Sequence, residues 1–283
     1  MKIDYHMHFE RGSYDYEWAK GFFAAAAARG LDDMGFTEHS HGFPEFRDLY
    51  YDDLTLGDTP VGAFQREWLK KNKFKYTLDE YFSFMELLAR RGCRAKIAME
   101  VCNFQDQAKV KAILAPYAFD YLVGSVHFVN GWGFDAAAVK EEFERRPLEE
   151  IYDGYAAEVE KLCVSGLYDV LGHPFNLRVY KYLPDFDVTP YLERVAQAVK
   201  KADMAIDINT GTLYRYPIAE ISPYPAFMEI AAEYELPIIT SSDAHEPEDC
   251  GAYIDEAVAY AKKYGYTKQL YFSGRDRKFV DLG

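Results

Sequence analysis

The chain has 283 residues, of which 49% are hydrophobic and 28% charged, a composition that excludes wholesale disorder, collagen-like repetition and a coiled coil. The formal net charge of -14 would repel a phosphate backbone, so nucleic acid is an unlikely partner. Because the chain shows no apolar run of about 18 residues, no C-x-x-C pair and no basic, apolar leader, we expect a cytoplasmic protein with reduced thiols and no membrane segment.

Short β-prone runs alternate with longer amphipathic runs along the chain. The predicted strands are Lys2–Met7, Met34–Thr37, Ala95–Val101, Tyr121–Val126, Asp169–Gly172, Met204–Ile208 and Leu236–Thr240. The predicted helices lie near residues 15–29, 78–91, 105–116, 147–164, 189–202, 223–235 and 247–264. This alternation is typical of a parallel sheet with crossover helices, and no linker or repeat interrupts it. We therefore expect a single α/β domain over residues 1–283, built as a closed or nearly closed β/α barrel.

The segment from His41 to Lys75 fits neither period and mixes aromatic, acidic and basic side chains. We expect a long loop there. Such loops are uncommon in compact domains unless they bind or cover something, so the segment is either a loop beside a functional site or an ordinary surface insertion. Directly after it, Thr77 and Glu80 have the spacing of a capping box, which predicts the start of a helix.

Six of the seven histidines lie at or just beyond the end of a predicted strand, and only His41 lies elsewhere. The six are His6, His8, His39, His127, His173 and His245. Because the C-terminal ends of barrel strands converge on one face, these six side chains should meet there. His6 and His8 share a face of their strand, since side chains alternate with period two, and Asp243 and His245 repeat that spacing after the last strand.

Two carboxylates accompany these histidines. Glu100 interrupts a run that otherwise has the pattern of a buried strand, and Glu38 precedes His39. A salt bridge from Glu100 to Lys96 or another basic residue is the alternative, but lone buried carboxylates are costly, which favours metal ligation. Imidazole and carboxylate ligands suit Zn, Mn or Fe as divalent ions. Eight strong candidates exceed the needs of one ion, so we expect two or three, with a carboxylate such as Glu100 bridging a pair.

The complete motif set resembles the PHP family, the polymerase and histidinol phosphatase superfamily. In chain order the pattern is H-x-H on the first strand, an acidic–His pair, a Glu, two single histidines and a terminal D-x-H, and it extends from Lys2 to about His245. The resemblance implies a distorted (β/α)7 barrel with its metals at the C-terminal ends of the strands. It also implies a metal-dependent phosphoric monoester hydrolase.

The resemblance further implies three metal positions. The ligands of the first would be His6, His8, Glu100 and Asp243. Glu100 would bridge to a second metal, held also by His127 and His173. The third would use His39 and His245. Many family members complete this third position with a histidine shortly after H-x-H, where this chain reads F-E-R-G-S-Y-D, so Glu10 is the first substitute and Asp15 the second.

Within the family, the segments H-F-E-R-G, G-H-P and I-N-T-G-T-L-Y-R-Y-P-I-A-E-I-S-P are most similar to stand-alone histidinol-phosphate phosphatases. The expected reaction is hydrolysis of L-histidinol phosphate to L-histidinol and phosphate, a step of histidine biosynthesis. Arginine donates two parallel hydrogen bonds to a phosphate, which makes Arg11, Arg178 and Arg215 candidate substrate-binding residues, unless each is only an exposed, salt-bridged side chain. Asp243 and His245 are the candidate catalytic acids for the leaving alkoxide.

Three other functions stay open. Hydrolysis of nucleotides or nucleic-acid phosphodiesters occurs in the same family but would favour a basic groove. An amidohydrolase-type barrel also opens with H-x-H, but it would want a lysine bridge or a different order of late histidines. A non-catalytic metal-binding or regulatory module would require missing ligands, and here only one ligand looks missing.

Overall fold

The computed structural model describes residues 1–71 and 73–283, and within them seven strands form one parallel sheet. In sheet order these are β1 (Ile3–Asp4), β2 (Asp33–His39), β3 (Lys96–Cys102), β4 (Tyr121–Ser125), β7 (Val170–Leu171), β8 (Ala205–Asn209) and β9 (Ile238–Ser241). Every neighbouring pair is parallel, and the sheet order follows the chain order. The carboxyl ends of the strands therefore lie at one end of the sheet.

The two outer strands curl towards each other and close the sheet. The Tyr5 amide donates a hydrogen bond of 3.2 Å to Thr240 O, and Met7 pairs with Ala244 in a parallel bridge just beyond the strand ends. The Thr240 hydroxyl also donates to Ile3 O at 2.7 Å. The predicted (β/α)7 barrel is confirmed, with its seam between β1 and β9.

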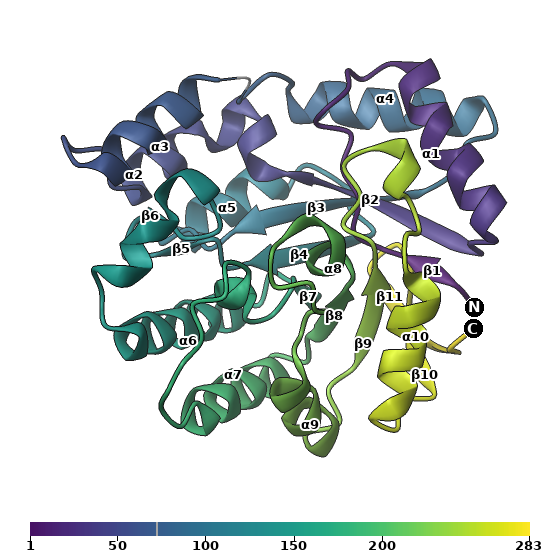
Figure 1. The fold of residues 1–283 in the computed structure, drawn as a ribbon. Helices are drawn as coiled ribbons and strands as arrows, with labels where there is room; N and C mark the ends of the chain where they lie inside the picture. Colours follow the sequence, from purple (N-terminus) through teal and green to yellow (C-terminus); the bar gives the residue numbers. More distant parts are fainter. Residues whose placement is uncertain (72) are drawn as a thin grey trace.

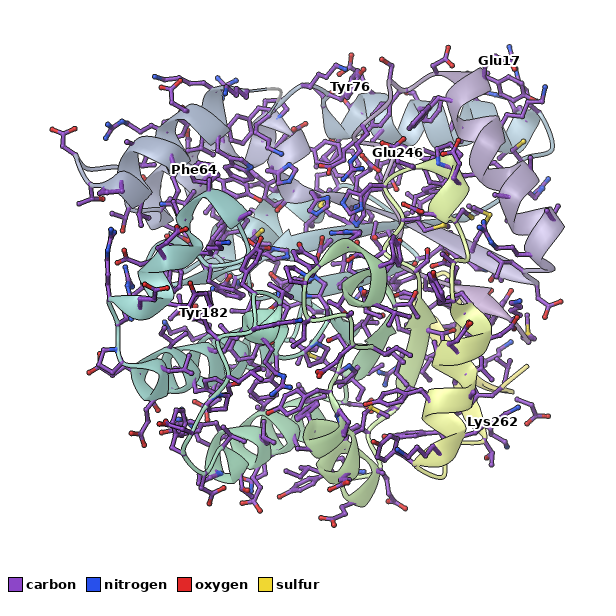
Figure 2. The ribbon with its side chains drawn as sticks, in the orientation of Figure 1. Glu17, Phe64, Tyr76, Tyr182, Glu246 and Lys262 are labelled. Carbon is purple, nitrogen blue, oxygen red and sulfur yellow. The ribbon has the colours of Figure 1, made fainter. Side chains whose placement is uncertain are left out.

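Helices surround the barrel (Figure 1), and side chains fill the space between them and the sheet (Figure 2). The crossover helices are α1 (Tyr16–Arg29), α4 (Leu78–Arg90), α5 (Gln107–Leu114), α6 (Leu148–Ser165), α7 (Thr189–Lys201), α9 (Pro225–Glu233) and α10 (Ile254–Lys263). Each occupies a stretch predicted to be helical. The predicted capping box begins α4, since Glu80 N–H donates to Thr77 Oγ1 while the Glu80 carboxylate accepts from Thr77 N–H. None of the helices in the described ranges is long and apolar enough to cross a membrane.

The segment predicted as a long loop contains two helices, α2 (Arg47–Asp53) and α3 (Pro60–Lys70), so that prediction is wrong in its secondary structure. Thr59 caps α3, and Pro60 occupies its first turn. The buried stripe of α3 includes Val61, Gln65 and Leu69, and the glutamine in it hides the helical period of apolar residues. Residue 72, also part of the predicted loop, lies outside the described residues.

Shorter elements were also missed by the sequence interpretation. They are β5 (Phe128–Val129), β6 (Trp132–Gly133), α8 (Gly211–Arg215), β10 (Lys268–Ser273) and β11 (Asp276–Asp281). The β10–β11 hairpin packs against the start of the barrel strands, where Phe272 stacks on Tyr121 with ring centroids 4.6 Å apart. Leu270 and Phe272 are buried in one apolar cluster with Ile3, Tyr5 and residues of β3, β4, β7, β8 and β9. This cluster fills the barrel at the end opposite the histidines.

Candidate metal centre

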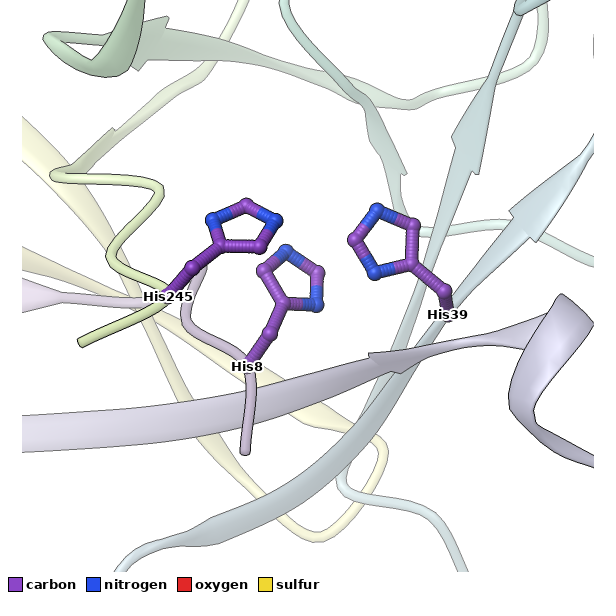
Figure 3. A group of neighbouring side chains, drawn as sticks. All are labelled: His8, His39 and His245. Carbon is purple, nitrogen blue, oxygen red and sulfur yellow. The ribbon is translucent and has the colours of Figure 1, made fainter. Parts of the chain in front are cut away.

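The carboxyl ends of the strands bring the predicted ligands together. The positions that supply them are the residues after β1 (His6, His8), the end of β2 (His39), β3 itself (Glu100), and the residues after β4 (His127), β7 (His173) and β9 (Asp243, His245). Three of these rings converge in Figure 3, where the centroid of His8 lies 3.9 Å from that of His39 and 4.5 Å from that of His245. The barrel thus gathers residues from six strands into one buried cluster.

Glu100 lies at the centre of the cluster. Its Oε1 atom lies 2.9 Å from His173 Nε2, 3.4 Å from His127 Nε2 and 3.5 Å from His6 Nε2. Burial would raise the pKa of the Glu100 carboxyl, but the surrounding imidazoles, led by His6, hold this pKa well below its ordinary value. The carboxylate is therefore charged although only 1% of the residue is exposed.

The second oxygen of Glu100 faces the other half of the cluster. Its Oε2 atom lies 3.1 Å from His39 Nε2 and 3.9 Å from His8 Nε2. His8 Nε2 in turn lies 3.4 Å from Asp243 Oδ1. The alternative partner predicted for Glu100, Lys96, instead pairs with Asp33 at 3.4 Å. Both oxygens of one carboxylate thus face imidazole nitrogens, as a bridging ligand requires.

Several buried histidine nitrogens lack a hydrogen-bond partner in the described part of the chain, which indicates whether the cluster can bind metal ions. Within the described residues, His6 Nε2, both nitrogens of His8, His39 Nδ1 and His173 Nδ1 are buried without a hydrogen-bond partner. Leaving such an atom unsatisfied costs about 1–3 kcal/mol, which a bound cation would offset. Four groups of three ligand atoms lie within 4.8 Å of one another: His6–His8–Glu100, Glu100–His127–His173, His8–His39–His245 and Glu10–His39–His41. The residues therefore fit divalent metals that accept nitrogen and oxygen ligands.

Glu10, rather than Asp15, reaches the third predicted position. Its Oε1 lies 3.3 Å from His245 Nε2, and its Oε2 lies 3.5 Å from His39 Nδ1. Asp15 caps helix α1, where its carboxylate accepts a 2.9 Å hydrogen bond from Trp18 N–H. Glu38, which was expected to need a cation, accepts a hydrogen bond from Phe9 N–H instead, and burial raises its pKa to about 8.

His41, which was predicted to lie apart from the other histidines, belongs to the cluster. Its Nε2 lies 3.6 Å from Glu10 Oε2, and its ring stacks on that of His39 at a centroid distance of 4.6 Å. A short 3-10 turn over Ser40–Gly42, directly after β2, places it there. The spacing of His39 and His41 equals that of the two recognised pairs, and this signal could have identified His41 from the sequence.

Asp207, another residue missed by the sequence interpretation, orients two ligands from behind. Its carboxylate oxygen Oδ2 lies 2.9 Å from His6 Nδ1, and the carboxylate also accepts hydrogen bonds from the Ser241 hydroxyl at 2.6 Å and Asn209 Nδ2 at 3.1 Å. Asn209 Nδ2 also lies 3.3 Å from Asp243 Oδ2. Because the carboxylate binds the His6 ring at Nδ1, Nε2 is the nitrogen that faces Glu100 and that would bind a metal. A charged residue inside the apolar run A-I-D-I-N was the available sequence signal.

We expect Asp207→Asn to weaken metal binding by about 10–100-fold, because an amide can no longer fix the His6 proton at Nδ1 as a carboxylate does. Competition with a chromogenic chelator would measure this affinity. The matched control is Asp169→Asn, which changes a buried acid that bonds the Leu122 amide and Arg275 and does not contact the cluster. Equal metal affinity in the two variants would contradict the orienting role of Asp207.

A cavity of about 270 Å³ opens beside Glu10 and His245. Arg11 and Arg215, two of the three candidate substrate-binding residues, line it. Arg215 Nη1 donates to Asp243 O at 2.6 Å and lies 2.8 Å from His245 Nδ1, whereas Arg11 is half exposed and lies 3.3 Å from Glu246. The D-x-H motif and Arg215 therefore form one unit at the cavity wall.

Arg178 lies apart from this cavity. It pairs with Glu220 at 3.2 Å, lies over the ring of Tyr224 at 4.0 Å, and lines a separate small cavity beside Pro174. The structure thus brings two of the three predicted arginines to the cluster. The phosphate contact predicted for Arg178 stays a prediction from the sequence.

The chain was compared with known proteins. The family model described as PHP domain matches residues 4–211. A probable histidinol-phosphatase of Deinococcus radiodurans is 36% identical over 157 residues, and this match covers 55% of the chain and 59% of that relative's length. A histidinol-phosphatase of Lactococcus lactis is 23% identical, with 96% of the chain and 95% of that protein covered.

Two solved structures share the fold. One is a histidinol phosphate phosphatase from Lactococcus lactis, complexed with zinc, L-histidinol and phosphate; it has a TM-score of 0.72 and 22% identity, and 98% of each chain is covered. The other is a putative histidinol phosphatase from Listeria monocytogenes, with a TM-score of 0.72 and 21% identity, covering 89% of this chain and 98% of that one.

Proposed function

Because the chain belongs to the PHP domain family, we propose that it is a metal-dependent phosphatase that hydrolyses L-histidinol phosphate to L-histidinol and phosphate. The observation that carries the proposal is the charged, buried Glu100 with imidazole nitrogens around both of its oxygens. The names of the relatives support the substrate. The match to the Deinococcus relative covers only 59% of that protein. That this chain shares the activity of the whole relative is therefore part of the proposal.

We further propose that two or three divalent ions of Zn, Mn or Fe bind in the cluster. The residues that would hold them are His6, His8, Glu10, His39, Glu100, His127, His173, Asp243 and His245. Zinc in the structure of the Lactococcus phosphatase supports the choice of metal class. When bound, the metals would stabilise negative charge on phosphoryl oxygens and lower the pKa of water.

The chain's own side chains would bind the phosphate and move the proton. Arg215 and Arg11 would bind phosphate oxygens in the cavity. Burial would raise the pKa of the Asp243 carboxyl, but Arg215 at 2.9 Å holds this pKa well below its ordinary value, so Asp243 is ionised. In the proposed reaction one of these two side chains, Asp243 or His245, accepts a proton from the attacking water and returns that proton to the leaving alkoxide.

A panel of phosphate esters tests the proposal. Metal-loaded protein should hydrolyse L-histidinol phosphate with a higher kcat/KM than nucleoside monophosphates or a generic aromatic phosphate monoester. A higher kcat/KM for a phosphodiester or for nucleoside monophosphates would show that the proposed substrate is wrong. The family assignment would be unaffected. Failure to hydrolyse any of these esters would favour the non-catalytic metal-binding module.

Removal of Arg215 should affect phosphate binding. Arg215→Ala is expected to raise KM for histidinol phosphate and to lower kcat/KM by about ten- to hundredfold, because a charge-assisted hydrogen bond is worth about 1.5–3 kcal/mol. Steady-state kinetics would measure this, and Arg178→Ala in the same assay tests the remaining arginine. Arg194→Ala is the control, since Arg194 pairs with Asp153 and Glu160 on α6. Unchanged kinetics of Arg215→Ala would contradict its role in phosphate binding.

A further inference from the structure

Lys73 is a third cationic side chain of the cavity, and it comes from the helical segment 41–75. It lines the cavity with Glu10, His41 and Trp68. Its ammonium nitrogen lies 3.2 Å from His41 Nε2 and 4.6 Å from the centre of the Trp68 ring. Because the lysine ammonium is only a donor, His41 Nε2 accepts this hydrogen bond. The ammonium group is therefore held inside the cavity by an imidazole on one side and an aromatic face on the other.

Among the described residues no carboxylate pairs directly with Lys73, although Glu10 and Asp135 line the same cavity and their charges favour the ammonium form. Arg11 and Arg215 pair with Glu246 and Asp243, whereas Lys73 forms no ion pair with any carboxylate in the part of the chain that the structure describes. Burial lowers the pKa of the Lys73 amine, with the charge of Glu10 opposing this. A partly buried ammonium that no carboxylate pairs with directly favours binding of an anion.

Two cations flank Glu10 in this cavity. On one side, Glu10 Oε1 lies 3.3 Å from His245 Nε2, and the other nitrogen of His245 lies 2.8 Å from Arg215 Nη1. On the other side, Glu10 Oε2 lies 3.6 Å from His41 Nε2, which accepts from Lys73. Donors that approach from two sides suit a tetrahedral anion with several oxygens better than a planar carboxylate with two.

From this geometry we propose that Lys73 is a substrate-binding residue that contacts the phosphoryl group of a phosphate monoester beside Glu10. The inference rests on the proposed function and adds to it a binding residue that no predicted motif contains. Lys73 has two further N–H donors besides the one given to His41, and these can bind phosphate oxygens. The arginine and the lysine would then contact the same phosphoryl group from opposite sides.

Helix α3, which precedes Lys73 in the chain, is anchored to other parts of the protein. Gln65 of α3 is 2% exposed, and its amide donates to Thr55 O at 2.7 Å and Gly131 O at 3.0 Å. Its side-chain oxygen accepts from Gly133 N–H at 2.8 Å. The bonds with Gly131 and Gly133 join α3 to the β5–β6 hairpin beside His127, and the bond to Thr55 joins α3 to the chain before it. These contacts account for the buried glutamine that interrupts the apolar stripe of the helix.

The test compares Lys73→Met with Lys75→Met. Methionine keeps an unbranched apolar stem against Trp68 and removes the charge together with the N–H donors. Lys75 is a matched control, because its ammonium also lies over an aromatic ring, that of Tyr76 at 4.8 Å, but it is exposed and does not line the cavity. Titration of inorganic phosphate into metal-loaded protein in a calorimeter would give the dissociation constant, and elemental analysis would give the metal content of each variant.

We expect Lys73→Met to raise the dissociation constant of phosphate by about ten- to hundredfold, with metal content unchanged, and Lys73→Arg to restore part of the affinity. Lys75→Met should stay within about twofold of the unaltered protein. Equal phosphate affinity of the two methionine variants would overturn the inference, and so would loss of metal from Lys73→Met. If unaltered protein hydrolyses no histidinol phosphate while the Lys73 effect is present, the proposed function fails and the phosphate contact stands.

Discussion

Replacing Glu100 with glutamine should lower bound metal and phosphatase rate together, each by more than about a hundredfold. The substitution keeps the shape of the side chain but removes the charge that its two oxygens present to five imidazole nitrogens. Loss of an outer partner of a ligand already costs about 10–100-fold in metal affinity, and a ligand shared between two ions should cost more. Elemental analysis and single-turnover kinetics on the same sample would measure both quantities.

The matched control for this substitution is Glu38→Gln. Glu38 is also buried at the end of a strand, but burial raises its pKa to about 8, so near neutral pH its carboxyl is mostly protonated and glutamine removes little charge. The control should keep its metal and its rate. Full metal content in Glu100→Gln would show that Glu100 does not bridge, whatever happens to the rate.

Removal of metal by a chelator should abolish phosphate-ester hydrolysis, and addition of Mn, Zn or Fe should restore it. The chain contains no Gly-rich dinucleotide loop or other organic-cofactor motif that could supply the chemistry instead. The unpartnered ring nitrogens in the cluster give a second readout, because a metal that binds only the folded protein stabilises it by about 2.7 kcal/mol at a concentration of 100 times its dissociation constant. The melting temperature should therefore rise on metal addition by several degrees.

The thermal measurement separates a catalytic from a structural effect of the metal. Glu100→Gln should show a much smaller rise in melting temperature than the unaltered protein when the same metal is added. Hydrolysis that resists exhaustive chelation, with no metal left by elemental analysis, would overturn the metal-dependent mechanism. The metal that restores the highest rate identifies the best-supporting ion.

The sequence was sufficient for the strands because each is a short apolar run with a polar residue at its carboxyl end. Such a run must be buried on both faces, which is typical of a parallel sheet, and His6, His39 and His245 mark the ends of three of them. The same logic failed for β10 and β11. Their antiparallel hairpin exposes residues such as Phe279, which is 60% exposed, so its pattern does not distinguish it from a loop.

The contributions of His41, Lys73 and Asp207 could not be predicted with the same certainty. His41 and Lys73 belong to a segment whose helices carry both buried and cavity-facing aromatic side chains. The position of its helix α3 over the barrel depends on hydrogen bonds of Gln65 with Gly131 and Gly133, which are remote from it in sequence. Asp207 acts through Ser241 and His6, which are remote from it in sequence. Contacts between distant segments are set by the tertiary fold, which local periodicity does not encode.

Leu270 and Phe272 of the β10–β11 hairpin close the end of the barrel opposite the histidines, which limits the route by which substrate and products can enter and leave. Phe272 is fully buried between Tyr5 and Tyr121, with ring centroids 5.8 Å and 4.6 Å away, so this end of the barrel offers no exit route. In the proposed reaction both products must therefore leave through the opening by which the ester arrived. Released phosphate would pass the same cations that captured it, and the residence time of phosphate there would set an upper limit on turnover.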